Sequence, residues 1–113
     1  TLWTWGSGTS GALGSGATAS RSSPVQVGAL TNWSLITSGV QCMASVKTDG
    51  TLWSWGSNYA YIPILYGNYG GQLGLGNITD YSSPKQVGAL TSWYSVSMAG
   101  QGNYTNTFAL RRV

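Results

Sequence analysis

The chain has few of the side chains that carry catalysis or bind metals. It contains no histidine and no glutamate, its carboxylates are Asp49 and Asp80, and its single cysteine is Cys42. General acid–base and glycosidase chemistry need positioned titratable groups, usually in pairs, and metal sites need several nitrogen, sulfur or carboxylate ligands. We therefore expect a protein that is not an enzyme and that holds neither a metal ion nor a cofactor.

Charge and long apolar runs are scarce as well. Charged residues make up 6% of the 113 residues, and the five basic ones are scattered apart from the pair Arg111 and Arg112. A nucleic-acid footprint needs clustered lysine and arginine to neutralise phosphates, so no nucleic-acid partner is expected. One cysteine excludes an internal disulfide and favours a small buried residue. No segment reaches the 18 or so apolar residues of a membrane helix, which argues against membrane insertion.

Glycine and aromatic residues are abundant instead. The chain has 17 glycines, six tryptophans and seven tyrosines. Residues that fill exposed helix faces are too few for a helical bundle, and disordered chains are usually poor in aromatics. Glycine-rich turns between aromatic and β-branched segments are typical of an all-β protein.

Two sequence repeats divide the chain. Residues 1–7 recur as residues 51–57 with six of seven positions identical, and residues 22–33 recur as residues 82–93 with ten of twelve identical. Recurrence of this quality indicates a tandem duplication. We assign repeat 1 to residues 1–50 and repeat 2 to residues 51–113.

Repeat 2 is longer than repeat 1 because it carries two insertions. The segment Gly-Ala-Leu-Gly at 11–14 matches Gly-Gln-Leu-Gly at 71–74, so ten extra residues lie between Ser57 and Gly70. A second, shorter insertion falls near residues 100–106, where the offset between the repeats rises from 60 to 64.

Each repeat is expected to form four short strands. The first is Leu-Trp-x-Trp, the second is Pro-x-Gln-Val after a turn at Ser22 and Ser23, and two more begin near Trp33 and Met43. Asp49 and Gly50 stand between two apolar segments, which is a strong hairpin signal because glycine supplies the positive φ of the turn. We predict two four-stranded antiparallel blades of a β-propeller, either part of a longer chain or completed by oligomerisation.

Four segments of the second repeat resemble the regulator-of-chromosome-condensation repeat. They are Asp-Gly-Thr-Leu-Trp-Ser-Trp-Gly at 49–56, Gly-Gln-Leu-Gly-Leu-Gly at 71–76, Ser-Pro at 83–84 and Trp-Tyr-Ser-Val-Ser at 93–97. The resemblance covers essentially the whole chain and implies a propeller, usually of seven blades. The family often carries a histidine before the last strand, which this chain lacks.

The two ends of the chain suggest a partner. A blade buries its faces only against neighbouring blades, so repeat proteins need several units. The chain begins at Thr1-Leu2-Trp3 without the preceding Asp-Gly turn and ends at 108–113 with the strand that should precede such a turn. We expect the ends to pair with other propeller blades or with copies of the chain; the alternative is that the 113 residues are part of a longer propeller.

The aromatic residues divide into a structural and a binding set. Repetition at equivalent positions favours blade packing, rather than sugar or base stacking, for Trp3, Trp5, Trp33, Trp53, Trp55 and Trp93, and Asp49 and Gly50 are assigned to the turn. Insertion 58–70 is tyrosine-rich, and tyrosine is enriched in binding surfaces. Its candidate binding residues are Tyr59, Tyr61, Ile62, Ile64, Leu65, Tyr66 and Tyr69. The alternative is a loop folded over its own or a neighbouring blade.

These observations favour a structural or adhesion module whose loops bind a neighbouring subunit, another protein or a surface glycan. The low charge and the richness in glycine, serine, threonine and tyrosine resemble exposed appendages of bacteria and their viruses, so we expect an extracellular, cell-surface or virion location. The family resemblance implies an alternative, a regulatory binding propeller that inhibits a secreted β-lactamase or acts as a guanine-nucleotide exchange factor on a small GTPase.

Overall fold

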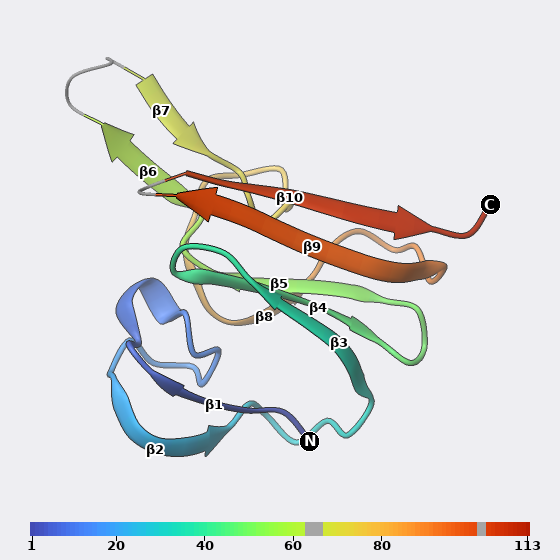
Figure 1. Ribbon diagram of the computed structural model, residues 1–113, viewed down its shortest axis with the longest axis horizontal. Coiled ribbons are helices and arrows are strands. Elements are labelled where there is room, and N and C mark those ends of the chain that lie inside the picture. The colour runs from blue at the N-terminus through green and yellow to red at the C-terminus, as the bar shows by residue number, and fades with distance from the viewer. Residues whose placement is uncertain (63–66, 102–103) are drawn as a thin grey trace.

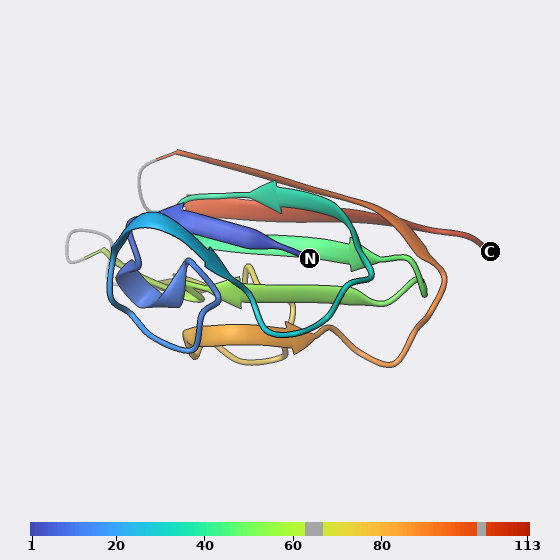
Figure 2. The same cartoon turned by 90° about the horizontal axis from the view of Figure 1, so that it is seen from below.

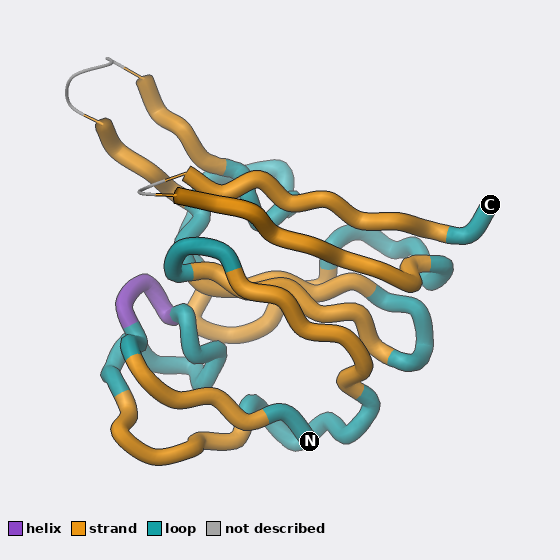
Figure 3. Tube along the Cα trace, viewed as in Figure 1, coloured by secondary structure: helices purple, strands orange, loops and turns teal. Residues whose placement is uncertain are grey.

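The computed structural model describes residues 1–62, 67–101 and 104–113. Within these residues the chain is all-β, as predicted, with one short 3₁₀ helix, η1 (Thr9–Gly11), and no α-helix (Figures 1 and 3). The strands are β1 (Trp3–Gly6), β2 (Arg21–Gln26), β3 (Trp33–Ser38), β4 (Cys42–Lys47), β5 (Leu52–Gly56), β6 (Tyr59–Ile62), β7 (Gly67–Gly70), β8 (Tyr81–Gln86), β9 (Trp93–Gln101) and β10 (Tyr104–Arg111).

A four-stranded antiparallel sheet with the order β3-β4-β5-β8 forms the centre of the molecule. Strands β3 and β4 come from repeat 1, and β5 and β8 come from repeat 2, because the Asp49-Gly50 turn joins β4 to β5. Two-stranded sheets, β1–β2 and β9–β10, lie on either side of this blade (Figure 1). The four-stranded antiparallel blade is therefore confirmed. It begins two strands later than the sequence repeat, so each repeat contributes two of its four strands.

The two-stranded sheets have the register of the two halves of the central blade. In β1–β2, Trp3 pairs with Gln26; at the equivalent place in β5–β8, Trp53 pairs with Gln86. Both ladders also have a register shift at the same point, just before the glycine that ends the aromatic strand. The sheet β1–β2 is thus the half-blade that corresponds to β5–β8.

The same comparison identifies β9–β10 as the other half-blade. Trp33 pairs with Lys47 in β3–β4, and Trp93 pairs with Arg111 in β9–β10, with a register shift beside each of these pairs. The offsets of 60 and 64 seen in the sequence are therefore the offsets of the strands themselves. One complete blade and two complementary halves make up the described chain.

The predicted turn at Ser22 and Ser23 is wrong, because both residues lie inside β2. Their equivalents lie inside β8, with Pro84. Proline has no N–H to donate and is tolerated in strands at the edge of a sheet. Both β2 and β8 are such edges, so proline here marks an outer strand rather than a turn.

The two insertions of repeat 2 both lengthen hairpins. The first forms the separate pair β6–β7, in which Tyr59 pairs with Gly70 and Ile62 with Gly67. The second extends β9 and β10 beyond the length of β3 and β4, with pairing that continues to Tyr104 and Gln101. Neither insertion changes the register in which the blade strands pair.

Both faces of the central sheet are covered. The hydrophobic core lies between this sheet and β9 and consists of Cys42, Ala44, Val46, Leu52, Leu73, Val96 and Met98. On the other side, η1 and the segment after it pack against β5 and β8. The molecule is flat, with extents of 42 × 38 × 20 Å, and Figure 2 shows it edge-on.

Candidate binding surfaces

Trp55 shows how a complete blade buries its aromatic strand. Its side chain is 0% exposed, and its Nε1 donates to the Ala12 carbonyl oxygen at 3.1 Å. The ring of Trp33 lies edge-on at 5.8 Å. Gly14 adjoins the indole so closely that an added Cβ would lie 2.6 Å from its Nε1. The cover of Trp55 therefore comes from the preceding half-blade.

Trp53 lies two residues earlier on the same strand and is held by a second set of contacts. Its ring meets Trp33 edge-on at 6.2 Å, and the ammonium of Lys47 stands 3.5 Å from its centroid. Its Nε1 donates to Thr51 Oγ1 at 2.8 Å. Burial lowers the pKa of Lys47, and the nearby Asp49 carboxylate opposes that effect. Cation and rings form one packed cluster beside the hairpin turn.

In the N-terminal half-blade the equivalent tryptophans are exposed. Trp3 is 48% and Trp5 is 61% exposed. Their local geometry is the same as in the complete blade, because Trp3 Nε1 donates to Thr1 Oγ1 at 3.0 Å just as Trp53 does to Thr51. The described residues thus leave these two indoles about half-exposed, whereas Trp55 is fully covered.

The C-terminal half-blade exposes apolar side chains as well. Phe108 and Leu110 of β10 are 62% and 57% exposed, whereas the equivalent residues of β4, Ala44 and Val46, are 1% and 3% exposed. The backbone edge of β10 that faces away from β9 has no neighbouring strand among the described residues.

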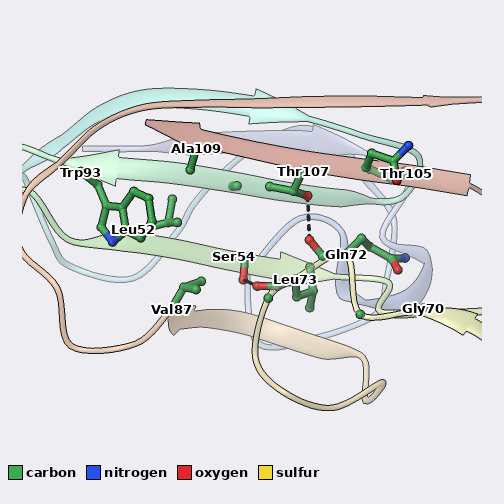
Figure 4. Close-up of a pocket in the computed structure, with 14 residues that line it drawn as sticks. Leu52, Ser54, Gly70, Gln72, Leu73, Val87, Trp93, Thr105, Thr107 and Ala109 are labelled. Atoms are coloured by element: carbon green, nitrogen blue, oxygen red, sulfur yellow. Dashed lines mark hydrogen bonds between the residues drawn. The ribbon is translucent and has the colours of Figure 1, made fainter. Parts of the chain in front are cut away.

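A groove of about 410 Å³ lies between the central blade and β10 (Figure 4). Its floor includes Leu52, Gly74 and Val87, and Trp93 closes one end. Two hydrogen bonds hold the segments that line the groove. Thr107 Oγ1 donates to the Gln72 carbonyl oxygen at 2.7 Å, and Ser54 Oγ donates to the Leu73 carbonyl oxygen at 2.7 Å (Figure 4). Its volume and mixed lining suit an aromatic side chain with one hydrogen-bond donor.

The hairpin turn between β4 and β5 is held by a carboxylate. Asp49 accepts hydrogen bonds from the hydroxyl of Thr51 at 2.6 Å and from its backbone N–H at 3.0 Å. These bonds, the hydroxyl's first, hold the pKa of Asp49 below its ordinary value. Gly50 follows with φ of +78° in close contact with the Thr91 carbonyl, where a side chain would not fit. The carboxylate thus bonds within its own turn, and its other oxygen, Oδ2, accepts a hydrogen bond from Asn32 Nδ2 at 3.3 Å.

The β6–β7 hairpin is anchored by a buried amide at its base. Asn58 is 0% exposed; its Nδ2 donates to the Asn77 carbonyl oxygen at 2.9 Å, and its Oδ1 accepts the Leu73 N–H at 3.1 Å. The backbone N–H of Asn58 donates to Asp80 Oδ1 at 2.7 Å. Beyond this base the hairpin extends away from the blades (Figure 1).

Among the candidate binding residues of the insertion, Tyr59 is described and is 39% exposed. Ile64, Leu65 and Tyr66 lie outside the described residues, as do the side chains of Tyr61, Ile62 and Tyr69, whose backbones are in β6 and β7. The structure therefore shows where the hairpin stands and what holds its base.

The described residues offer little chemistry. No three histidine, cysteine or carboxylate side chains among them lie close enough to share a metal ion. Cys42 is buried, and burial raises the pKa of its thiol. In the same part of the chain no helix is long and apolar enough to cross a membrane.

Two features of these surfaces were not predicted from the sequence. The groove depends on where β10 stands relative to the 70–74 turn, and no local pattern encodes that distance. Asn58 has no equivalent in repeat 1, where Gly8 follows the serine instead. In the sequence, its polar neighbours Asn77 and Asp80 are recognisable only as residues of a polar loop.

The family model described as Regulator of chromosome condensation (RCC1) repeat matches residues 1–46. These residues comprise β1 to β3 and most of β4, and the strand equivalences above extend the same pattern into the second repeat.

Proposed function

We propose that this chain, whose residues 1–46 match the RCC1 repeat family model, is a non-enzymatic structural or adhesion module that binds through the β6–β7 hairpin. RCC1 repeats form propeller-type binding modules, so the coarse function follows from the family. The finer proposal concerns the partner, which we take to be a protein or glycan displayed on a surface.

One observation carries this proposal: the hairpin is present in repeat 2 and absent from repeat 1, although the blade strands are otherwise equivalent. It adds nothing to the register of the central sheet. An insertion that the blade does not need, placed on a rigid base, is the usual location of recognition in a scaffold protein.

The composition of the hairpin supports the same proposal. Residues 59–69 include Tyr59, Tyr61, Tyr66 and Tyr69. Tyrosine offers a large, stiff contact area and a hydroxyl donor at low entropic cost. The Asn58 anchor holds the base of the hairpin, so binding costs less ordering at that point.

The test replaces residues 60–69 by Asn-Gly, which closes a two-residue turn between Tyr59 and Gly70 and keeps the Asn58 anchor. A second variant keeps the length of the hairpin and changes Tyr61, Tyr66 and Tyr69 to serine. Both variants should retain the urea midpoint of the parent, because the hairpin lies outside the core. Both should lose binding to a glycan microarray and to intact bacterial cells, the two probes used for the parent.

The family also supports a second candidate, a regulatory propeller. Two assays test this candidate. One measures inhibition of a purified secreted β-lactamase, and the other measures nucleotide release from a GDP-loaded small GTPase. Activity in either assay, with no binding to cells or glycans, contradicts the adhesion proposal and favours regulation. Binding that survives both hairpin changes contradicts the assignment of the site.

A further inference from the structure

We propose that the cavity between the first half-blade and the central blade binds one neutral pyranose ring of a sugar, and that Ser15 is the residue that makes room for it. The cavity has a volume of about 240 Å³, and its lining residues run from Gly14 to Pro84. The inference goes beyond the proposed function because it uses no residue of the β6–β7 hairpin.

Two parts of the fold that lie side by side in Figure 1 form the walls of the cavity. One wall is the segment that follows β2 and includes Val27 and Leu30. The other wall is the central blade, with Trp53 of β5 and Pro84 of β8. Neither wall depends on the outer strand edges of β1 and β10.

Ser15 occupies a position that is apolar in the second repeat. The segments Gly-Ala-Leu-Gly-Ser-Gly at 11–16 and Gly-Gln-Leu-Gly-Leu-Gly at 71–76 are equivalent, so Ser15 corresponds to Leu75. Leu75 packs against the hydrophobic core. A serine side chain fills less of the same space than a leucine, and protein interiors leave few voids of this kind. Repeat 1 thus leaves open a space that repeat 2 fills with an apolar side chain.

Two buried polar atoms beside the cavity have no partner in the protein. Among the described residues, Ser15 Oγ and Trp33 Nε1 are buried and make no hydrogen bond, and both residues line the cavity. An unpaired buried hydroxyl lowers stability, which a leucine at position 15 would not do. A serine hydroxyl turns about one bond between three staggered positions, so it can meet a ligand without movement of the backbone. A polar ligand therefore accounts for the serine better than packing does.

The remaining lining defines the class of ligand. The indoles of Trp33 and Trp53 supply aromatic surface, and none of the described residues that line the cavity is charged. The Lys47 ammonium stands 4.5 Å and 3.5 Å from the centroids of these two rings and does not line the cavity. A pyranose ring is neutral, its C–H bonds suit the negative face of an indole, and its hydroxyls suit those of Ser15 and Ser83.

The volume limits the site to one ring. Pockets that hold drug-sized ligands measure about 300 to 1,000 Å³, so a cavity of about 240 Å³ takes a monosaccharide or the terminal residue of a longer glycan. A ligand with so few atoms binds weakly. We expect a dissociation constant on the order of 1 mM.

The test follows the six tryptophan Nε1–H signals of the 113-residue chain by ¹⁵N–¹H NMR. The probes are the methyl pyranosides of glucose, galactose, mannose and N-acetylglucosamine, added separately. At least one of them should shift the signals of Trp33 and Trp53 with a dissociation constant on the order of 1 mM. The signal of Trp55, whose Nε1 is bonded to the Ala12 carbonyl, should stay nearly unchanged.

Ser15→Leu installs the residue of the second repeat and separates binding from folding. It fills the cavity, so binding should be lost, while the urea midpoint should stay the same or rise because an apolar side chain replaces an unpaired hydroxyl. Thr18→Leu changes an exposed residue of the same loop and is the matched control, which should bind like the parent. Ser15→Ala keeps the cavity but removes the hydroxyl; it should weaken binding roughly 5-fold and serves if the leucine variant does not fold.

A parent whose Trp33 and Trp53 signals do not move with any probe up to about 50 mM overturns the proposal, and the cavity then holds water alone. Binding that Ser15→Leu leaves unchanged overturns it as well. The Asn-Gly hairpin variant should bind the probe like the parent. Millimolar affinity is too weak to retain the protein on an array or a cell, so those assays report on the hairpin and the NMR titration reports on the cavity.

Discussion

Trp55 and Trp5 occupy equivalent positions in two half-blades, so replacing each by alanine compares one side chain in two environments. Trp55 is 0% exposed and Trp5 is 61% exposed. Replacing a buried tryptophan by alanine costs about 4 kcal/mol of unfolding free energy. The buried two-fifths of Trp5 should cost about 1.5 kcal/mol when scaled by area.

Urea unfolding followed by far-UV circular dichroism measures the difference. With a slope of about 1.5 kcal/mol per M, Trp55→Ala should lower the midpoint by about 2.7 M and Trp5→Ala by about 1 M. If Trp55→Ala proves unfolded in buffer, Trp55→Phe keeps part of the ring contact and gives a smaller shift.

Equal midpoints for the two alanine variants would refute the reasoning. They would mean that the cover of Trp55 by Gly14, Ala12 and Trp33 contributes nothing to stability.

Three further predictions concern single groups. Asn58→Ala should lower the unfolding free energy by about 2 kcal/mol, seen as a lower urea midpoint, because it leaves the Leu73 N–H without its acceptor; an unchanged midpoint would contradict the anchor. The pKa of Asp49 is lowered in the folded state by the Thr51 hydroxyl, so its contribution is present above the unfolded pKa and is lost as pH falls below about 4; thermal unfolding should show that Asp49→Asn removes this part of the acid sensitivity. Burial raises the pKa of the Cys42 thiol, so iodoacetamide should modify it slowly at pH 8 and rapidly in urea; rapid modification of the folded protein would show that β4 opens.

The repeats made the strands and their register predictable, but not the phase of the blades. Near-identity of residues 1–7 and 51–57 placed β1 and β5 at equivalent positions, and the offset of 64 correctly matched β10 to β4. The error at Ser22 and Ser23 arose because Ser-Ser-Pro is typical of turns, whereas an edge strand tolerates proline equally well.

The position of the Asp49-Gly50 turn explains why the structure depends more on where a blade begins within the sequence repeat than on the number of strands in each repeat. The boundary between two sequence repeats can be placed at any point of the period. The identity between the repeats is the same wherever the boundary is placed. The structure depends on where the boundary falls, because the hydrogen bonds of β4 to β5 cross it, whereas the edges of β1 and β10 that face away from β2 and β9 have no neighbouring strand among the described residues. The exposed fractions of Trp5 and Phe108 are the physical consequence: residues that pack in one blade stand open in the next.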